Sequence, residues 1–315
     1  METAVKYPRG IRQISAQARL LGSLPAGMER HISNIFCAQT KRKEWIKIMK
    51  KHKLKSIAPT YAVLILFAII WVLPLIIAVT KSFTINGLGN YAYVLNYDKI
   101  NYFQVIFNSM SIAVISALTV TVITALAAFA FSKMHFKGGK IIYGAVLACL
   151  AVPIAAVTTP LFSVIKNLGL LDSHFGVILP LIAFNAPMML LMLKNYFDTI
   201  PDELLESARI DGASTFRIWY EFMVPLSVPM IANVLVLTFI YSWNDYLVPL
   251  LVMRSESNYP VTLAAQFFMS STYQSPVDVA RIYAVMILLA LPSILVYLFS
   301  QKFLVAGITA GSVKG

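Results

Sequence analysis

The sequence has too few charged residues for a water-soluble protein. Only 13% of its 315 residues are Asp, Glu, Lys or Arg, whereas a soluble globular domain averages about 25%. Apolar residues make up 58% of the chain, so the charged side chains are too few to coat a surface that faces water. This composition excludes a soluble enzyme, a disulfide-stabilised secreted module and a disordered tail, and it predicts an integral membrane protein.

Cysteine is also scarce, and the usual catalytic and metal-binding patterns are missing. The two cysteines are Cys37, in a basic segment, and Cys149, in an apolar run, and they support neither a disulfide framework nor a thiolate metal site. The four histidines show no ligand spacing, and no Ser/His/Asp or paired-carboxylate arrangement is evident. We therefore expect no metal ion and no catalytic residue in this chain.

What the sequence does contain is a series of long apolar runs. A hydrocarbon core about 30 Å thick needs about 20 residues of helix to cross it. In lipid each such run must be helical, because a lone strand would leave its backbone groups unsatisfied. Six candidate runs are Ala58–Thr80, Val105–Phe131, Ile141–Ile165, Phe175–Leu193, Pro225–Met253 and Ile282–Ser300. We expect an all-α integral membrane protein with six transmembrane helices.

Several of these runs contain prolines, including Pro153, Pro160, Pro180 and Pro187. Proline breaks helices in soluble proteins, but neighbouring helices in a membrane bundle tolerate it. We therefore expect these prolines to kink the helices and not to end them.

The distribution of Lys and Arg predicts the orientation, since short cytoplasmic segments are enriched in basic residues. Half of the 26 basic residues precede Ala58, and most of the others follow the second and fourth runs or lie near the C-terminus. Both termini are therefore expected in the cytoplasm. The net charge of +12 would suggest nucleic-acid binding in a soluble protein, but its placement here points to the membrane surface, and we expect no nucleic acid.

Residues 1–57 are expected to form a poorly ordered basic tail that touches anionic lipid. No apolar core and small-residue cleavage site follow its charged start, so the first run is expected to act as an uncleaved signal anchor. A second hypothesis is that translation begins at Met49, because the residues from Met49 onward already supply a short basic leader. Residues 58–315 would then form the six-span domain.

The most informative segment is the polar stretch between the fourth and fifth runs, residues 198–225. Pro201 suits the first turn of a helix, and Asp202 and Glu203 lie beside the positive end of its dipole. Gly212 is placed to end this helix with a positive φ. Apolar spacing puts Leu204, Leu205 and Ala208 on one face of it.

A second short helix is expected to follow, with Phe216, Trp219 and Phe222 as its apolar face, until Pro225 opens the fifth run. Acids outnumber bases in this pair of helices, whereas a helix that lies on lipid headgroups should be basic. The acids are Asp202, Glu203, Glu206, Asp211 and Glu221. We expect the pair to press against a protein partner.

The run Glu-Ser-Ala-Arg-Ile-Asp-Gly-Ala at 206–213, which continues to Ile218, Pro225 and Pro229, resembles the EAA motif of membrane subunits of binding-protein-dependent ABC importers. This chain departs from the motif in having Ser207 for the first Ala. The ending Thr-Ala-Gly-Ser-Val-Lys-Gly at 309–315 resembles that of the maltose-type permease subunit in carbohydrate importers, and the segments 193–201 and 242–249 are similar to the same subfamily. The resemblance runs from about residue 58 to the end.

This resemblance implies a type I ABC importer transmembrane domain, a non-catalytic permease subunit that moves a sugar or oligosaccharide inward. Its partners would be a homologous second permease, two ATP-binding subunits and an extracytoplasmic solute-binding protein. ATP and Mg²⁺ would bind the ATPase partners, which fits the lack of any Gly-x-x-x-x-Gly-Lys-Ser/Thr loop in this sequence. The ATPase-docking residues that the motif implies are Glu203, Glu206, Ser207, Ala208, Asp211, Gly212, Ala213, Ile218 and Pro225.

Two other classes remain as alternatives. One is an importer subunit of the same architecture for another cargo, such as a phosphorylated polyol or a peptide. The other is a stand-alone secondary transporter, which would normally show internally repeated halves or several intramembrane ionisable groups. Only one acid in the six runs and an acidic docking loop argue against the second class.

Candidates for the translocation pathway are Asn185, Trp243, Asn244 and Asp245. An intramembrane carboxylate usually faces a bundle interior or water. However, Asp245 lies near the outer end of the fifth run, where a charge costs little. It either lines the pathway or is a structural partner to Asn244, a neighbouring helix or the companion permease.

Aromatic and amide side chains allow two interpretations each. Trp243 and Tyr246 suit an interfacial aromatic belt as well as a platform on which a sugar stacks. Asn108 and Asn185 suit hydrogen bonds between helices, the commoner use of amides in membranes.

Overall fold

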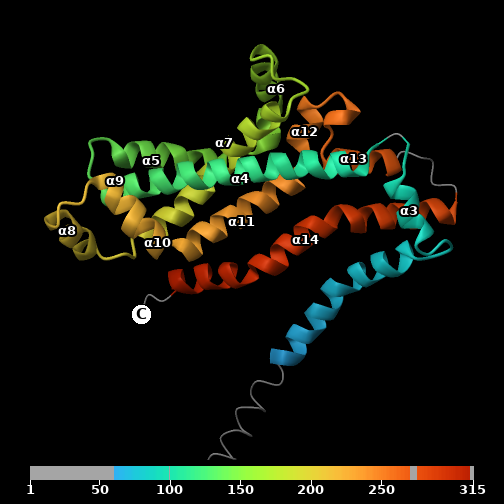
Figure 1. The fold of residues 1–315 in the computed structure, drawn as a ribbon, viewed down its shortest axis with the longest axis horizontal. Coiled ribbons are helices and arrows are strands. Elements are labelled where there is room, and N and C mark those ends of the chain that lie inside the picture. Colours follow the sequence, from blue (N-terminus) through green and yellow to red (C-terminus); the bar gives the residue numbers. More distant parts are fainter. Residues whose placement is uncertain (1–59, 99, 270–274, 313–315) are drawn as a thin grey trace, which may run out of the picture. The chain divides into compact units, whose positions relative to one another are not determined.

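The computed structural model describes residues 60–98, 100–269 and 275–312, and side chains within 60–266 and 275–301. These residues form helices and turns, and no strand occurs among them (Figure 1). The chain divides into two units, Met1–Leu75 and Ile76–Gly315. The first apolar helix, Thr60–Ser82, agrees with the first expected run, whereas the expected basic tail at 1–57 lies outside the described residues.

The second unit is a succession of helices. In chain order they are α3 (Gly89–Leu95), α4 (Tyr102–Lys133), α5 (Gly139–Ala148), η1 (Cys149–Ala151), η2 (Ile154–Val157), α6 (Thr158–Asn167), α7 (His174–Phe197), α8 (Asp202–Ile210), α9 (Thr215–Ile218), the π-helical turn η3 (Trp219–Met223), α10 (Val224–Leu226), α11 (Val228–Asn244), α12 (Leu247–Val252), η4 (Glu256–Asn258), α13 (Val261–Met269) and α14 (Pro276–Ser312).

Four described helices are long and apolar enough to cross a membrane: Thr60–Ser82, α4, α7 and the part of α14 from Pro276 to Gln301. Two further helix pairs qualify only if each is counted as one bent span. These are Gly139–Ala151 with Ile154–Asn167, bent by 95°, and Thr215–Leu226 with Val228–Asn244, bent by 80°. The all-α, multi-pass fold is therefore confirmed, while six spans is the upper count and stays a prediction.

The prolines behave differently in the third and fourth runs. Pro180 and Pro187 lie inside the continuous helix α7, as expected, and Pro160 lies in the first turns of α6, where a missing N–H costs little. The expectation for Pro153 was wrong, because the helix ends before it. Val152 and Pro153 are both extended, since a proline disfavours the helical conformation of the residue before it.

The fifth run is also not one continuous helix. Pro225 lies in α10, and the chain bends at Ser227 before α11 begins. At the other end α11 stops at Asn244, because Asp245 is extended and its Oδ2 accepts a hydrogen bond of 3.0 Å from Val248 N. A short polar side chain that bonds the backbone three residues on starts the new helix α12 there.

Helices α4, α7 and α11 pack against one another and form the core of the second unit. The buried face of α4 carries small side chains, which let helix backbones approach closely in membrane proteins. They are Ala113, Ala117, Ala125 and Ala128. Large apolar side chains of α4 face outward instead, for example Phe103, Phe107 and Leu118, and this inverted pattern is typical of a surface covered by lipid or by another apolar partner.

Candidate functional site

Helix α8 forms as the sequence predicts. Pro201 is its N-cap, and Asp202 and Glu203 occupy the first turn. Gly212 has a φ of +82°. Gly212 N donates to the Arg209 carbonyl and Ala213 N to the Ala208 carbonyl, each at 3.0 Å. This pair of bonds is a Schellman motif, which satisfies the last carbonyls of a helix and requires a left-handed residue.

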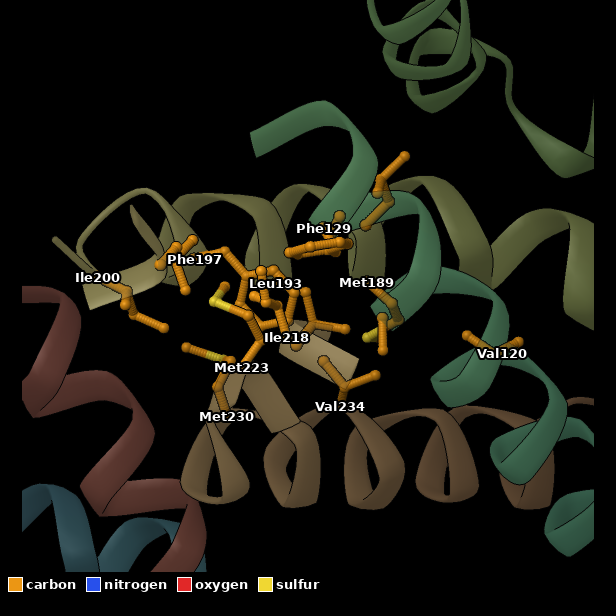
Figure 2. Packing of buried hydrophobic residues seen from close by; sticks show 14 of the residues in the cluster. Val120, Phe129, Met189, Leu193, Phe197, Ile200, Ile218, Met223, Met230 and Val234 are labelled. Carbon is orange, nitrogen blue, oxygen red and sulfur yellow. The ribbon is translucent and has the colours of Figure 1, made fainter. Parts of the chain in front are cut away.

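One face of α8 is built into the core of the chain. Leu205 and Ala208 are buried in a cluster with Leu193 and Phe197 of α7, and Figure 2 shows this α7 part of the cluster. Leu204, which the sequence analysis placed on the same face, is 49% exposed, so that assignment was wrong. With 3.6 residues per turn, Leu204 lies on the other side of Ala208 from Leu205, at the edge of the buried stripe.

The side chains that the second short helix buries within this chain are not those of its expected apolar face. Ile218 and Met223 are fully buried and point toward Leu193 (Figure 2), whereas Phe216 and Phe222 are exposed and Trp219 is partly buried. The expected face assumed a regular α-helix. The chain instead makes a π-helical turn over Trp219–Met223, which adds a residue to the turn and so shifts the register of the buried side.

The predicted docking residues therefore divide into two groups. Ala208 and Ile218 are buried in the chain's own core and Ala213 is partly buried against it, so as they stand none of them is free to face a partner. The other predicted docking residues are exposed: Glu203, Glu206, Ser207, Asp211, Gly212 and Pro225.

Sequence reasoning named Phe216 but missed two other exposed apolar side chains of this segment, Ile210 and Tyr220. Ile210, the last residue of α8, is 86% exposed, and Phe216 and Tyr220 are exposed too. The sequence did contain a signal for Ile210, because this residue lies on the opposite side of α8 from Leu205 and Ala208. Exposed apolar side chains rimmed by charged ones are typical of a protein interface. We define the docking surface as Glu203, Glu206, Ser207, Ile210, Asp211, Gly212 and Phe216.

Sequence reasoning also missed the residue that fastens α8 to α4. The Lys133 side chain is only 4% exposed, and its Nζ donates to the Ile200 carbonyl at 2.6 Å and to Asp202 Oδ1 at 2.7 Å. The hydrogen bond and charge of Lys133 lower the pKa of the Asp202 carboxyl. Beside it, Asp198 accepts from Ser132 Oγ at 2.7 Å and pairs with Lys194 Nζ at 2.6 Å.

The side chains of the pathway candidates make contacts within this chain. Trp243 is 3% exposed and stacks on Phe239, with ring centroids 5.8 Å apart, so it is neither an interfacial aromatic nor a free stacking platform. Asn185 donates to the Leu181 carbonyl of its own helix and Asn244 to the Ile240 carbonyl. These amides serve their own helices in this structure.

Asp245 and Asn108 have structural contacts. Asp245 is half-buried, its carboxylate caps α12 through Val248, and its carbonyl accepts from Thr262 Oγ1 at 2.8 Å. This geometry favours the structural interpretation of Asp245. Asn108 Nδ2 donates to the carbonyls of Ser257 and Tyr259 at 2.8 and 3.1 Å, so it joins α4 to the segment before α13.

Another set of polar contacts joins the loop between α6 and α7 to residues 254–255. Asp172 has a φ of +56°, and its carboxylate accepts from Arg254 N, from Ser255 N and from the Ser255 hydroxyl. Burial favours a higher pKa for Asp172, but these hydrogen bonds outweigh it and lower the pKa to about 2. Close by, a Cβ on Gly176 would lie 2.2 Å from the Leu170 carbonyl oxygen.

Comparison with known proteins places this architecture. A family model described as "Binding-protein-dependent transport system inner membrane component" matches residues 120–310. The chain is 32% identical to the arabinooligosaccharides transport system permease protein AraQ of Bacillus subtilis, over 73% of this chain and 80% of AraQ. It is 37% identical to the sn-glycerol-3-phosphate transport system permease protein UgpE of Yersinia pestis, over 61% of this chain and 68% of UgpE.

A solved structure shares the fold. A chain of a bacterial ABC transporter involved in the import of the acidic polysaccharide alginate superimposes with a TM-score of 0.68 at 22% identity, over 79% of this chain and 97% of that one.

Proposed function

We propose, on the premise that the chain belongs to the family of binding-protein-dependent transport system inner membrane components, that it is the permease subunit of an ATP-driven importer whose cargo is a sugar or oligosaccharide. The name of the relative AraQ, an arabinooligosaccharide permease protein, supports the cargo class. The observation that carries the coupling part of the proposal is the docking surface itself, which projects acidic and apolar side chains from a segment whose other face is buried in the core.

We infer that the docking surface seats in a cleft of a partner ATPase. Glu203, Glu206 and Asp211 would supply charge complementarity, and Ile210 and Phe216 the apolar contact. Buried apolar anchors within a polar rim carry most of the binding energy in protein interfaces. Ala208 and Ile218 act from the inside, because they hold α8 and α9 on the core.

The proposed mechanism is mechanical. Two ATPases that close on nucleotide would draw the docked segments of two permeases together, and the attached helices would move the pathway from inward-facing to outward-facing. The other partners would be a homologous permease and an extracytoplasmic solute-binding protein, and this chain would have both termini in the cytoplasm. ATP and Mg²⁺ would bind the ATPases, so this chain would carry no catalytic residue.

A second candidate is an importer of the same architecture for a phosphorylated polyol. The observation that favours it is the 37% identity to UgpE, a permease protein for sn-glycerol-3-phosphate. The two candidates differ in cargo and share the coupling mechanism.

Reconstitution tests the proposal. The chain is purified from its native membrane with its partners and placed in liposomes with the solute-binding protein, and uptake of radiolabelled arabinooligosaccharides and of sn-glycerol-3-phosphate is measured. The expected result is uptake that needs ATP and the binding protein, and that stops when the ATPases carry a disabled nucleotide site. Preference for sn-glycerol-3-phosphate would support the second candidate. Uptake by the isolated chain on an ion gradient alone would refute both.

A further inference from the structure

The contact between Lys133 and Asp202 is not explained by a gain in protein stability. Taking an ammonium group out of water is costly, and replacing a buried ion pair by apolar side chains often leaves stability unchanged or higher. The partner carboxylate of Asp202 is 70% exposed, so solvent screens the attraction between the two charges. A methionine would fill similar space without a buried charge, although the Ile200 carbonyl would lose this donor.

Helix dipoles do not account for the contact either. A basic residue is favourable at the C-terminus of α4, and an acid is favourable at the N-terminus of α8. Each preference would be met even if the two side chains never touched. What the 2.7 Å contact adds is geometry, because it holds the first residue of α8 against the last residue of α4.

Further hydrogen bonds hold the start of α8 to the end of α4. Lys133 also donates to the Ile200 carbonyl, just before α8 begins. The preceding residue, Ser132, donates to Asp198, which is itself paired with Lys194 at the end of α7. Two consecutive residues of α4 therefore contact the connection between α7 and α8, residues 198–201, and the first residue of α8. A sideways movement of α8 would then displace the end of α4.

Helix α4 is suited to carry such a movement. Its 32 residues contain neither proline nor glycine, the usual causes of kinks, and at 1.5 Å per residue it is about 48 Å long. Near its other end Asn108 binds the carbonyls of Ser257 and Tyr259, and Ser109 Oγ accepts from Val261 N at 2.7 Å. Helix α4 thus has specific polar attachments near both ends.

We propose that Lys133 is a positioning residue that locks α8 to α4, so that a movement of the docked helix passes into α4 and along it to the segment that contains Ser257. This inference rests on the proposed function, in which α8 docks on an ATPase. It differs from a purely stabilising role, because it predicts that loss of the contact separates the motion of α8 from that of α4 without loss of the fold.

Distance measurement by electron paramagnetic resonance tests the lock in the assembled complex. Cys37 and Cys149 are replaced by serine, and nitroxide labels are placed at the exposed positions Arg209 on α8 and Phe107 on α4. In the wild-type background the distance distribution should stay narrow and unchanged when ATP is added, because the two helices move as one body. With Lys133→Met it should broaden or shift when ATP is added.

A functional measurement accompanies it, namely solute molecules taken up per ATP hydrolysed in liposomes. This ratio should fall about fivefold or more in Lys133→Met and in Asp202→Asn. Asp202→Glu should keep most of it, because the longer carboxylate has room at an exposed position. Lys137→Met removes an exposed lysine from the loop that follows α4 and should stay close to the wild-type ratio.

The outcomes separate the two proposals. If no ATPase co-purifies with the wild-type chain, the proposed function fails. If the wild type transports with ATP, but both the ratio and the distance distribution of Lys133→Met and Asp202→Asn match it, only the lock is refuted. A merely structural role would lower thermal stability and yield while leaving the ratio unchanged. Should Lys133→Met not assemble, Asp202→Asn decides, because its side chain is mostly exposed.

Discussion

Substitutions of Gly212 can distinguish two roles of this residue: its left-handed backbone conformation in the segment 198–225, and its proposed contact with a partner. A non-glycine residue in the left-handed region costs roughly 1–2 kcal/mol, and part of this is offset by the lower entropy of the unfolded chain. A Cβ at Gly212 would meet nothing within 4 Å, so no clash inside the chain adds to this cost. Gly212→Ala should therefore lower the stability of the chain by about 1 kcal/mol, and Asn or Asp by less, since both tolerate this conformation.

Transport should follow a different order. If the corner of α8 enters a cleft of the ATPase, a larger and charged side chain at Gly212 harms docking most. We expect Gly212→Ala to retain most ATP-dependent uptake, Gly212→Asn less, and Gly212→Asp little, although the complex still assembles. Stability and transport are measured by thermal unfolding in detergent and by uptake into liposomes, and their orders should be opposite for Ala and Asp.

Gly138 provides a matched control. It has a φ of +84°, and a Cβ there also meets nothing within 4 Å, but it lies in the loop between α4 and α5 and is not one of the residues of the docking surface. Gly138→Asp should show the same small backbone cost as Gly212→Asp and near-normal uptake. Equal loss of uptake at both glycines, or uptake that simply tracks stability across the Gly212 series, would refute the docking role.

Four further predictions concern Asp172, Gly176 and Trp243. Asp172→Ala should lower the free energy of unfolding by roughly 2–3 kcal/mol and Asp172→Asn by under about 1 kcal/mol, because Asn keeps hydrogen-bonding capacity and tolerates the positive φ; comparison of the two melting curves checks this. The pKa of Asp172 is lowered to about 2, so its ionised form stabilises the fold fully above about pH 5. This contribution is lost as the pH falls toward 2, and melting curves measured over a pH series would show the loss. Gly176→Val should abolish stable folding, because even a Cβ would lie 2.2 Å from a backbone oxygen, and size-exclusion profiles of the expressed protein report it. Trp243→Ala should cost about 3–5 kcal/mol as a core truncation and lower uptake of every cargo alike; a change in cargo preference at normal stability would instead restore a pathway role for Trp243.

Local signals in the sequence predict local structure well in this chain. The start of α8 at Pro201 and its end at Gly212 follow from the residues themselves, because N-terminal proline and C-terminal glycine act on the backbone directly. Apolar run length likewise predicted α4, α7 and the helix Thr60–Ser82 within a few residues. These features need no knowledge of what packs against them.

Features that depend on the third dimension were the ones missed. The buried face of α9 could not be predicted, because the π-helical turn at Trp219–Met223 changes the register. Lys133 looked like one more basic residue of a cytoplasmic loop, since its contacts with Ile200 and Asp202 span almost 70 positions of sequence. Trp243 looked amphipathic until the fold placed Phe239 against it.

The half-buried state of the docking segment bears directly on how it can transmit force. Leu205, Ile218 and Met223 are buried with almost no exposure, and full burial of such side chains contributes about 1.5–3 kcal/mol each. Pulling the segment off the core would therefore cost roughly 5 kcal/mol or more, before any loss at Lys133 is counted. A loop that merely lay on the surface would yield when a partner pulled on it. This segment would resist, so the less costly response to a pull on α8 would be movement of the helices to which it is attached. Under the proposed function, the buried face of the segment is therefore what would let a partner docked outside move the helices inside the membrane.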